Sequence, residues 1–427
     1  MHPRTSLLAV ALLCACASAP VSRSEAHMNA IAESYVKLVL AVGQHDANYV
    51  DAYYGPPEWK ASADSAKLSL DEILRRADTA LAQLGTPAAT NELPALRQRY
   101  LRTQLGSLRA RVQMLQGKRF TFDEESKALY DAVAPTHDDA HFQRVIDTLS
   151  RLLPGTGPVP ERMEEFRRAF VIPREKLDTV FATAIAECKA RTARHLALPP
   201  GERFTVEPVV DKPWSGYNWY QGSYRSLIQV NVELPIYIDR AVDLACHEGY
   251  PGHHVYNALL EHHLVRELGW WEYSVYPLFS PQSLIAEGSA NYGIEMAFPG
   301  EERVAYEKAV LFPLAGLDAS RADAYYAVQD LMRELTYAGN EAARRYLNGQ
   351  ITAEQAADWM VRYSLSSPER ARQRVRFFDT YRSYVINYNL GQDLVKAYVE
   401  RAAAPAERWR LFGELLSTPR LPGDLVR

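Results

Sequence analysis

The composition of this chain lacks the marks of several broad classes of protein. Of its 427 residues only 22 are glycine, and the sequence shows no collagen-like period and no internal repeat. With 47% hydrophobic and 23% charged residues, the chain can bury a sizeable core. Disordered, collagen-like and repeat-array proteins are therefore excluded, and we expect one large or two ordinary globular domains.

An excess of charge of one sign is also lacking. The 48 basic and 52 acidic residues give a formal net charge of −4, and the basic residues are spread along the chain. Proteins that bind nucleic acid usually gather their basic residues into a patch or stripe. We therefore expect no nucleic-acid partner.

No hydrophobic run is long enough to anchor the chain by crossing a bilayer. The N-terminal run LLAVALLCACA follows Arg4 and is too short to span stably, which indicates an export signal. The residues Leu13-Cys14-Ala15-Cys16 resemble a bacterial lipobox, so we predict removal of residues 1–15 and an outer-membrane lipoprotein facing the periplasm, anchored through a lipid on Cys16. The alternative is an ordinary signal peptide cut after Ala17-Ser18-Ala19, which would leave a soluble periplasmic or secreted protein.

Cysteine is scarce as well. After processing at Cys16, only Cys188 and Cys246 remain. An export route permits these two to form a disulfide beside His247. Two buried thiols are the alternative, because the separation that would decide between them cannot be measured from the sequence.

Helical periodicity is what the sequence has in abundance. Amphipathic helices are expected from Met28, from about Pro173 and through the C-terminal third. In that last third, Thr352–Gln355 forms a capping box, and Ser367 caps a helix that begins with proline. The sequence therefore predicts a mostly α-helical fold.

Alternation of apolar and polar residues is nearly confined to LIQVNVELP (227–235), which predicts a half-buried edge strand. The aromatic and polar segment WSGYNWYQGSYR (214–225) before it is expected to be a loop. The clearest linker is LPGTGPVPER (153–162), rich in proline and glycine. We accordingly predict an N-terminal helical subdomain over 16–153 and a catalytic helical domain over 154–427.

The candidate catalytic residues begin in ACHEGYPGHHVYN (245–257). In the zinc-peptidase pattern H-E-x-x-H, two histidines one helical turn apart bind the metal, and the glutamate is the general base for the zinc-activated water. His247 and Glu248 begin this pattern, but Pro251 stands where the second histidine belongs. The next histidines are His253 and His254.

Pro251 and Gly252 explain how a later histidine can return to the metal. On a straight helix His253 would lie roughly 9 Å along the axis from His247. Pro251 prevents such a helix because it has no N–H and crowds the His247 carbonyl, while Gly252 gives the backbone freedom to widen the turn. The residues predict a bulge, and they leave open whether His253 or His254 is the ligand. The other histidine would line the cleft or bond a ligand.

A third ligand is offered by SLIAEGSANYG (283–293). Glu287 lies in a helix-compatible stretch 40 residues after His247, and Asn291, one turn later, could bond a ligating histidine from behind. Two histidines and one glutamate with an open fourth position are typical of a catalytic site for one Zn²⁺ ion.

The string His247-Glu248-x-x-Pro-Gly-His253-His254, followed by Ala-Glu287-Gly, resembles the bacterial domain of unknown function 885 family, many of whose members look like exported lipoproteins. The likeness covers roughly residues 30–400 and includes Tyr388 in NYNLG, which matches the family's C-terminal tyrosine-x-x-glycine element. Two positions depart from it: Ser289 replaces a common tryptophan, and RSYVINYN replaces the usual Pro-Gly-Gln-Ala-Leu lead-in.

The family is in turn similar to the gluzincin peptidases. That resemblance implies a large α-helical metallopeptidase-like fold in which the strand 227–235 lies beside the zinc helix and pairs with an extended peptide. It also favours His253, because neighbouring gluzincin motifs end in Gly-His.

The expected function is a zinc-dependent metallohydrolase, a peptidase that cleaves peptide or amide bonds in the cell envelope. Glu248 would be its general base, and Tyr388 would donate a hydrogen bond to the oxyanion. Cell-wall amides are an alternative substrate. The alternative function is a non-catalytic periplasmic binding or scaffold lipoprotein with a structural or vestigial metal site.

Overall fold

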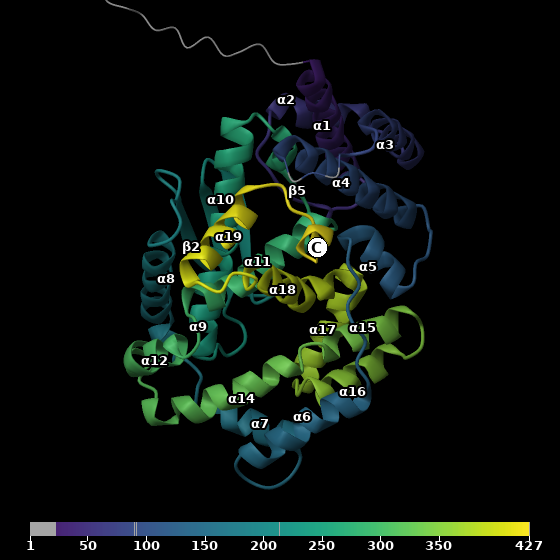
Figure 1. Cartoon of the computed structure of the whole chain (residues 1–427). Helices are drawn as coiled ribbons and strands as arrows, with labels where there is room; N and C mark the ends of the chain where they lie inside the picture. Colours follow the sequence, from purple (N-terminus) through teal and green to yellow (C-terminus); the bar gives the residue numbers. More distant parts are fainter. Residues whose placement is uncertain (1–22, 89, 91, 213, 427) are drawn as a thin grey trace, which may run out of the picture.

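The computed structural model describes residues 23–88, 90, 92–212 and 214–426, and its fold is mostly helical, as predicted (Figure 1). The lipobox and Cys16 lie outside the described residues. No helix in the described part of the chain is long and apolar enough to cross a membrane. The helices that precede the three-stranded sheet are α1 (Arg23–Val42), α2 (Pro57–Ala66), α3 (Leu70–Leu84), α4 (Leu93–Leu115), α5 (Phe122–Tyr130), α6 (Asp139–Leu152), α7 (Val159–Arg168) and α8 (Leu177–Ala193).

Helices also make up most of the chain after that sheet. The Thr352 capping box and the Ser367 cap both form, because each side chain accepts the backbone N–H three residues later. The α-helices here are α9 (Asp239–Leu244), α10 (His253–Leu260), α11 (Pro281–Ala297), α12 (Glu302–Tyr306), α13 (Phe312–Ala315), α14 (Ala322–Glu334), α15 (Ala338–Leu347), α16 (Ala353–Tyr363), α17 (Pro368–Tyr381), α18 (Ile386–Val399), α19 (Pro405–Ser417) and α20 (Pro422–Leu425).

Helices α11 and α18 pack against each other near the centre of the molecule (Figure 1). Their contact depends on glycine, since a Cβ on Gly288 would overlap the backbone of Gly391, and a Cβ on Gly391 would crowd the backbone of α11. Only glycine lets two helix backbones approach this closely. The approach brings Glu287 on α11 beside the chain that leads into α18.

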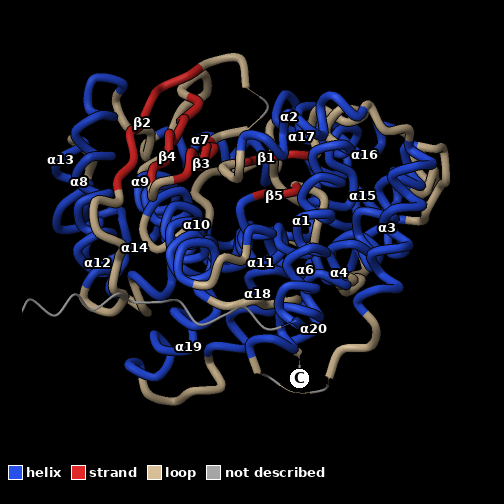
Figure 2. The backbone as a smooth tube through the Cα atoms, turned by 90° about the horizontal axis from the view of Figure 1, so that it is seen from above, coloured by secondary structure: helices blue, strands red, loops and turns tan. Residues whose placement is uncertain are grey.

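Two small sheets complete the fold (Figure 2). In one sheet, β1 (Val50–Tyr53) pairs with β5 (Val275–Pro277), and the two strands run antiparallel to each other. In the other, the order is β2 (Arg203–Val209), β4 (Arg225–Asn231), β3 (Gly216–Gly222), with β2 parallel and β3 antiparallel to β4.

This order corrects two predictions. The strand expected at the edge is β4, which lies in the middle, and the segment expected to be a loop contains β3, an edge strand. The alternation in β3 is hard to recognise because its buried positions include polar side chains. Asn218 donates to the Glu248 carbonyl oxygen at 2.7 Å, and Tyr220 donates to the Glu261 carboxylate at 2.5 Å. These hydrogen bonds give the Asn218 side-chain N–H group and the Tyr220 hydroxyl partners inside the fold.

The predicted boundary at 153/154 falls in the loop between α6 and α7. Side chains from both sides of it, such as Tyr35 and Phe142 before it and Phe312 and Phe378 after it, belong to one hydrophobic core. The site described next is accordingly built from both parts of the chain.

Candidate metal centre

The helix that carries His247 departs from α-helical geometry where the sequence predicted a bulge. Helix α9 runs into a π-helical turn, η2 (Ala245–Gly249), and α10 then begins at His253. A cis peptide bond joins Tyr250 to Pro251. Gly252 cannot be replaced without movement, because a Cβ there would overlap the His247 carbonyl oxygen. The bulge is confirmed, and it is followed by a break that places His247 and His253 on separate helices.

Three side-chain atoms converge at this break. His253 Nε2 lies 3.1 Å from His247 Nε2, and Glu287 Oε2 lies 3.3 Å from His247 Nε2 and 3.7 Å from His253 Nε2. Zinc bonds of about 2.0 to 2.1 Å in tetrahedral geometry separate neighbouring ligand atoms by roughly 3.3 Å. The three atoms therefore stand close to where three ligands of a single ion would stand.

His254 points elsewhere. Its fully buried ring lies with Nδ1 at 2.9 Å from Ser226 Oγ and Nε2 at 2.9 Å from Glu202 Oε2, so both nitrogens already have partners. Consecutive helical residues point about 100° apart, which sends the rings of His253 and His254 in different directions. The prediction that left His254 open as a ligand, or as a residue lining the cleft, is corrected: His253 reaches the convergence point.

Polar side chains support the converging residues from behind. Asn291 Oδ1 lies 2.9 Å from His247 Nδ1, as predicted, and Asn291 Nδ2 donates to the Tyr388 carbonyl oxygen at 2.9 Å. The Tyr384 hydroxyl donates to Glu287 Oε1 at 2.8 Å. The sequence did not single out Tyr384, because it is one of 25 tyrosines and only the fold brings it to Glu287.

The electrostatics of Glu287 and His247 reflect this convergence. Burial alone would raise the pKa of Glu287, but the neighbouring His247 and His253 hold that pKa well below its ordinary value. Burial alone would lower the pKa of His247, but Glu287 and Glu248 raise it. Among the described residues, neither Glu287 Oε2 nor Glu248 Oε2 has a hydrogen-bond partner. Buried carboxylate oxygens without partners are costly, so the site fits a cation that would bind them.

Glu248 lies beside the converging atoms without pairing with them. Its carboxylate and the two histidine nitrogens lie within 4.8 Å of one another, and its side chain is buried. Strand β3 presses against it, since a Cβ on Gly216 would lie 2.9 Å from Glu248 Oε1. A carboxylate in this position can exchange a proton with a molecule held at the convergence point.

Tyr388 and Asp51 face the same space. Burial raises the pKa of Tyr388 well above its usual value, which keeps the hydroxyl a donor, and no described residue bonds that hydroxyl. Burial also raises the pKa of Asp51 to about 7, and Tyr217 donates to its carboxylate. No sequence motif marks Asp51, which lies on β1 nearly two hundred residues before His247.

These residues line one large cleft of about 1490 Å³. Its walls come from β3, α9, α14, α17 and α18. From the three-stranded sheet it is lined by Gly216–Asn218 of β3 and by Asn231 at the end of β4. A cleft of this size accommodates an extended chain of several residues.

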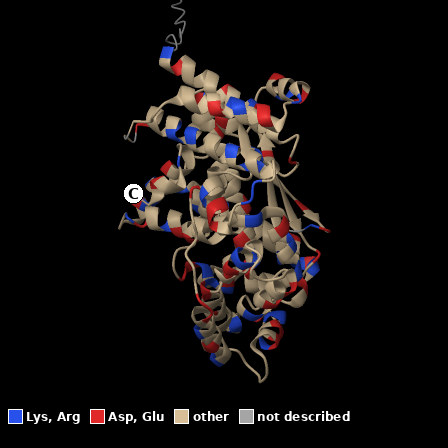
Figure 3. Ribbon diagram, turned by 90° about the vertical axis from the view of Figure 1, so that its right-hand side faces the viewer, with Lys and Arg blue, Asp and Glu red and all other residues tan. Residues whose placement is uncertain are grey.

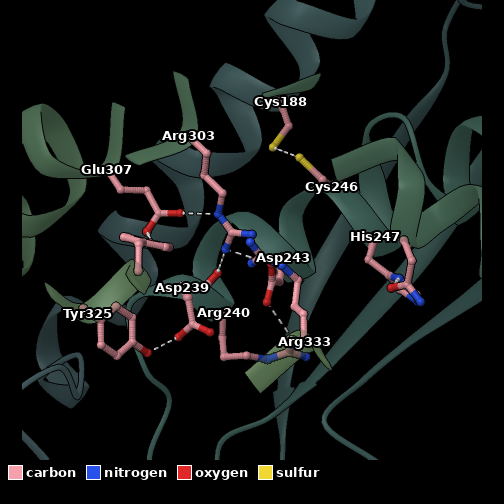
Figure 4. A network of polar contacts seen from close by, with 12 residues as sticks. Cys188, Asp239, Arg240, Asp243, Cys246, His247, Arg303, Glu307, Tyr325 and Arg333 are labelled. Atoms are coloured by element: carbon pink, nitrogen blue, oxygen red, sulfur yellow. Dashed lines mark hydrogen bonds and ion pairs between the residues drawn. The ribbon is translucent and has the colours of Figure 1, made fainter. Parts of the chain in front are cut away.

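Cys246 immediately precedes His247 in the chain and faces Cys188 (Figure 4). Both are buried, and their sulfur atoms are 2.6 Å apart. The contact joins α8 to η2, next to His247. The two cysteines that the sequence suggested could pair are therefore neighbours.

The chain resembles known proteins in its fold. No protein-family model matches the chain, and no curated protein matches it. Among solved structures it is similar to a candidate lipoprotein from Colwellia psychrerythraea, with 18% identity, a TM-score of 0.50, and coverage of 86% of this chain and 71% of that one. It is also similar to a candidate lipoprotein of unknown function from Shewanella oneidensis, with 13% identity, a TM-score of 0.45, and coverage of 86% and 75%. The first likeness shows that this chain shares its mostly helical fold with another protein.

Proposed function

We propose that this protein is a zinc-dependent metallopeptidase that hydrolyses peptide or amide bonds. The observation that carries the proposal is the convergence of His247 Nε2, His253 Nε2 and Glu287 Oε2 at separations of 3.1 to 3.7 Å. The same residues carry the resemblance to the domain of unknown function 885 family and to gluzincin peptidases, and we include membership of that group in the proposal.

In this proposal His247, His253 and Glu287 hold one zinc ion, and Asn291 and Tyr384 orient two of these ligands. Zinc held in this way supplies a Lewis acid for the substrate carbonyl and makes water more acidic. Two histidines and a glutamate are also a ligand set that leaves room for substrate.

The chain's own residues then move the protons. Glu248, whose Oε2 has no partner among the described residues, takes a proton from the attacking water and passes it to the leaving amine. The Tyr388 hydroxyl donates to the carbonyl oxygen as negative charge develops there. Strand β3 takes the place that the sequence assigned to β4, and its edge at Gly216–Asn218 pairs with an extended substrate along the cleft.

The proposal places this activity in the cell envelope. The lipobox at Leu13–Cys16 supports export and a lipid anchor on Cys16. The structurally similar protein from Colwellia psychrerythraea is itself described as a candidate lipoprotein, which agrees with this location. An anchored enzyme facing the periplasm would meet peptides and cell-wall amides as substrates.

The test combines metal content with hydrolysis. Purified protein is analysed for bound metal and assayed against a library of peptides and muropeptides. We expect one zinc per chain, and we expect Glu248→Gln to retain the zinc while lowering kcat by roughly 10²- to 10⁴-fold, the usual contribution of a general base. Glu301→Gln, at an exposed position on the surface, is the matched control and should keep both. Full zinc occupancy without hydrolysis of any library member would instead favour a binding or scaffold protein.

A further inference from the structure

Two arginines on α17, Arg370 and Arg374, lie one helical turn apart, and both line the cleft. In the part of the chain that the structure describes, neither guanidinium forms an ion pair with a carboxylate. Arg374 is half-buried, and burial lowers its pKa, whereas Arg370 is exposed to solvent. The cleft therefore has a positively charged region without a counter-ion from the protein.

The other basic residues of the cleft differ from this pair. Basic and acidic residues are interspersed along the chain (Figure 3). Most basic residues that line the cleft have an acidic partner. The Arg303 guanidinium lies 2.8 Å from Asp243 and 2.9 Å from Glu307 in the network of Figure 4. The remaining pairs are Arg240 with Asp243 at 3.0 Å, Lys396 with Glu295 at 2.6 Å, and Arg333 with Asp330.

Aromatic rings hold Arg374 in place. Its guanidinium carbon lies 4.3 Å from the centre of the Phe377 ring and 5.7 Å from the centre of the Tyr388 ring. No described residue accepts a hydrogen bond from this guanidinium. An arginine positioned by ring faces, with its N–H groups free, can bind a carboxylate through two parallel hydrogen bonds.

The position of Arg374 relates it to the candidate metal centre through Tyr388. The centre of the Tyr388 ring lies 5.7 Å from the Arg374 guanidinium carbon, and the Tyr388 carbonyl oxygen accepts a hydrogen bond from Asn291, which also bonds His247. Tyr388 thus connects the unpaired Arg374 to the candidate metal centre. A substrate whose scissile bond lies at the metal centre would bring a nearby group to Arg374.

We propose that Arg374, assisted by Arg370, binds a carboxylate of the substrate, and that this carboxylate is the free C-terminus of a short peptide. The inference rests on the proposed function, and it makes the enzyme an exopeptidase acting near the C-terminus. An acidic side chain offers the same carboxylate chemistry, so the test separates the two sources.

The experiment measures binding and hydrolysis separately. The probes are Ala-Phe-Ala with a free C-terminus, its C-terminal amide, and the amide Ala-Phe-Asp-NH₂, which has only a side-chain carboxylate. Binding is measured by calorimetry on zinc-supplemented Glu248→Gln protein, and hydrolysis on protein with Glu248 intact. We expect the free acid to bind best, and Arg374→Gln to weaken its binding by roughly 10- to 100-fold without changing that of Ala-Phe-Ala amide.

Two further variants separate a binding role from a structural one. Arg374→Lys, which keeps the charge without the fork of donors, should recover part of the affinity. Arg376→Gln, at an exposed position on the same helix, is the matched control and should bind like the parent protein. Equal binding of the free acid and its amide, unchanged in Arg374→Gln, would overturn the carboxylate site.

The remaining outcomes distinguish this inference from the proposed function. Preferential binding of Ala-Phe-Asp-NH₂ that depends on Arg374 would overturn the C-terminal assignment in favour of an acidic side chain. Equal hydrolysis of the acid and amide peptides would overturn the exopeptidase inference and leave the peptidase proposal standing. Binding of the free acid that depends on Arg374, in a protein that hydrolyses nothing, would overturn the peptidase and support the carboxylate site.

Discussion

His253 and His254 are neighbours on α10, and each faces a buried glutamate, yet their surroundings differ. Glu202, beside His254, has both oxygens engaged: Oε1 lies 2.7 Å from Lys189 Nζ, and Oε2 accepts from Tyr250 at 2.6 Å and lies 2.9 Å from His254 Nε2. Glu287, beside His253, accepts one hydrogen bond on Oε1, and its Oε2 has none from the described residues.

The difference teaches how to tell a structural cluster of buried charges from a binding site. Both glutamates have a lowered pKa, so both are ionised near neutral pH. A structural cluster satisfies each buried lone pair with a protein donor, since an unsatisfied one is costly. A binding site leaves a lone pair without a protein donor, so that a ligand can take it. Here the oxygen without a donor is Glu287 Oε2, which faces two histidine nitrogens.

The largest expected effect is on zinc affinity. His253→Ala removes one of the three proposed ligands, so we expect zinc affinity to fall by more than the roughly 10- to 100-fold that loss of an outer partner causes. His254→Ala should leave zinc affinity unchanged, because its ring lies in the Glu202 cluster. Competition with a chelating dye measures both. The comparison fails if His254→Ala loses zinc and His253→Ala keeps it.

The next largest effect is on folding stability, and here His254→Ala is the variant that should matter. His254→Ala leaves a cavity and deprives Glu202 of a partner, so we expect the free energy of unfolding of the metal-free protein to fall by about 2–4 kcal/mol. His27→Ala, at an exposed position on α1, should change it by less than about 0.5 kcal/mol. Urea unfolding followed by circular dichroism provides the measurement, and a stability loss no larger than that of the control would contradict a structural role for His254.

A smaller effect is expected from the groups that orient each ring. Asn291 holds Nδ1 of His247, and Ser226 holds Nδ1 of His254, both at 2.9 Å. Asn291→Ala should weaken zinc binding by roughly 10- to 100-fold, as expected for a partner behind a ligand. Ser226→Ala makes the matched change in the other cluster and should leave zinc affinity unaltered. Equal zinc affinities for the two variants would remove Asn291 from the metal centre.

The sequence predicted the parts of this arrangement that depend on local rules. Helical periodicity and caps gave the mostly helical fold. Pro251 and Gly252 predicted the bulge, because the missing N–H of proline and the backbone freedom of glycine both act within one helical turn. Asn291 follows Glu287 by one helical turn, so the two side chains share a face of α11. This spacing predicted the contact between Asn291 and His247.

The parts that depend on contacts distant in sequence could not be predicted. The choice between His253 and His254 depends on where Glu202 and Ser226 lie, which only the packing of β2 and β4 around α10 decides. Strand β3 escaped recognition because its buried polar residues Asn218 and Tyr220 donate hydrogen bonds to partners elsewhere in the chain. Asp51 reaches the site through the fold alone.

The smallest expected effect is a pH dependence confined to the His254 cluster. Burial alone would raise the pKa of Glu202, but His254, Lys189 and Tyr250 lower it from 4.5 to about 2. Because the pKa is lower in the folded than in the unfolded chain, the stability that Glu202 contributes is present above pH 4.5 and is lost as the pH falls toward 2. In the metal-free protein, Glu202→Gln should cost on the order of 1–3 kcal/mol near neutral pH.

The pH profile separates this ionic contribution from simple loss of packing. The difference in unfolding free energy between Glu202→Gln and the parent should shrink between pH 4.5 and 2, because the parent then also carries a neutral group at this position. Glu301→Gln, at an exposed position, should run parallel to the parent at every pH. Urea midpoints at several pH values test this. A Glu202→Gln deficit that stays constant with pH would mean that the cluster stabilises the fold through shape alone, and the contrast with Glu287 would then concern packing instead of charge.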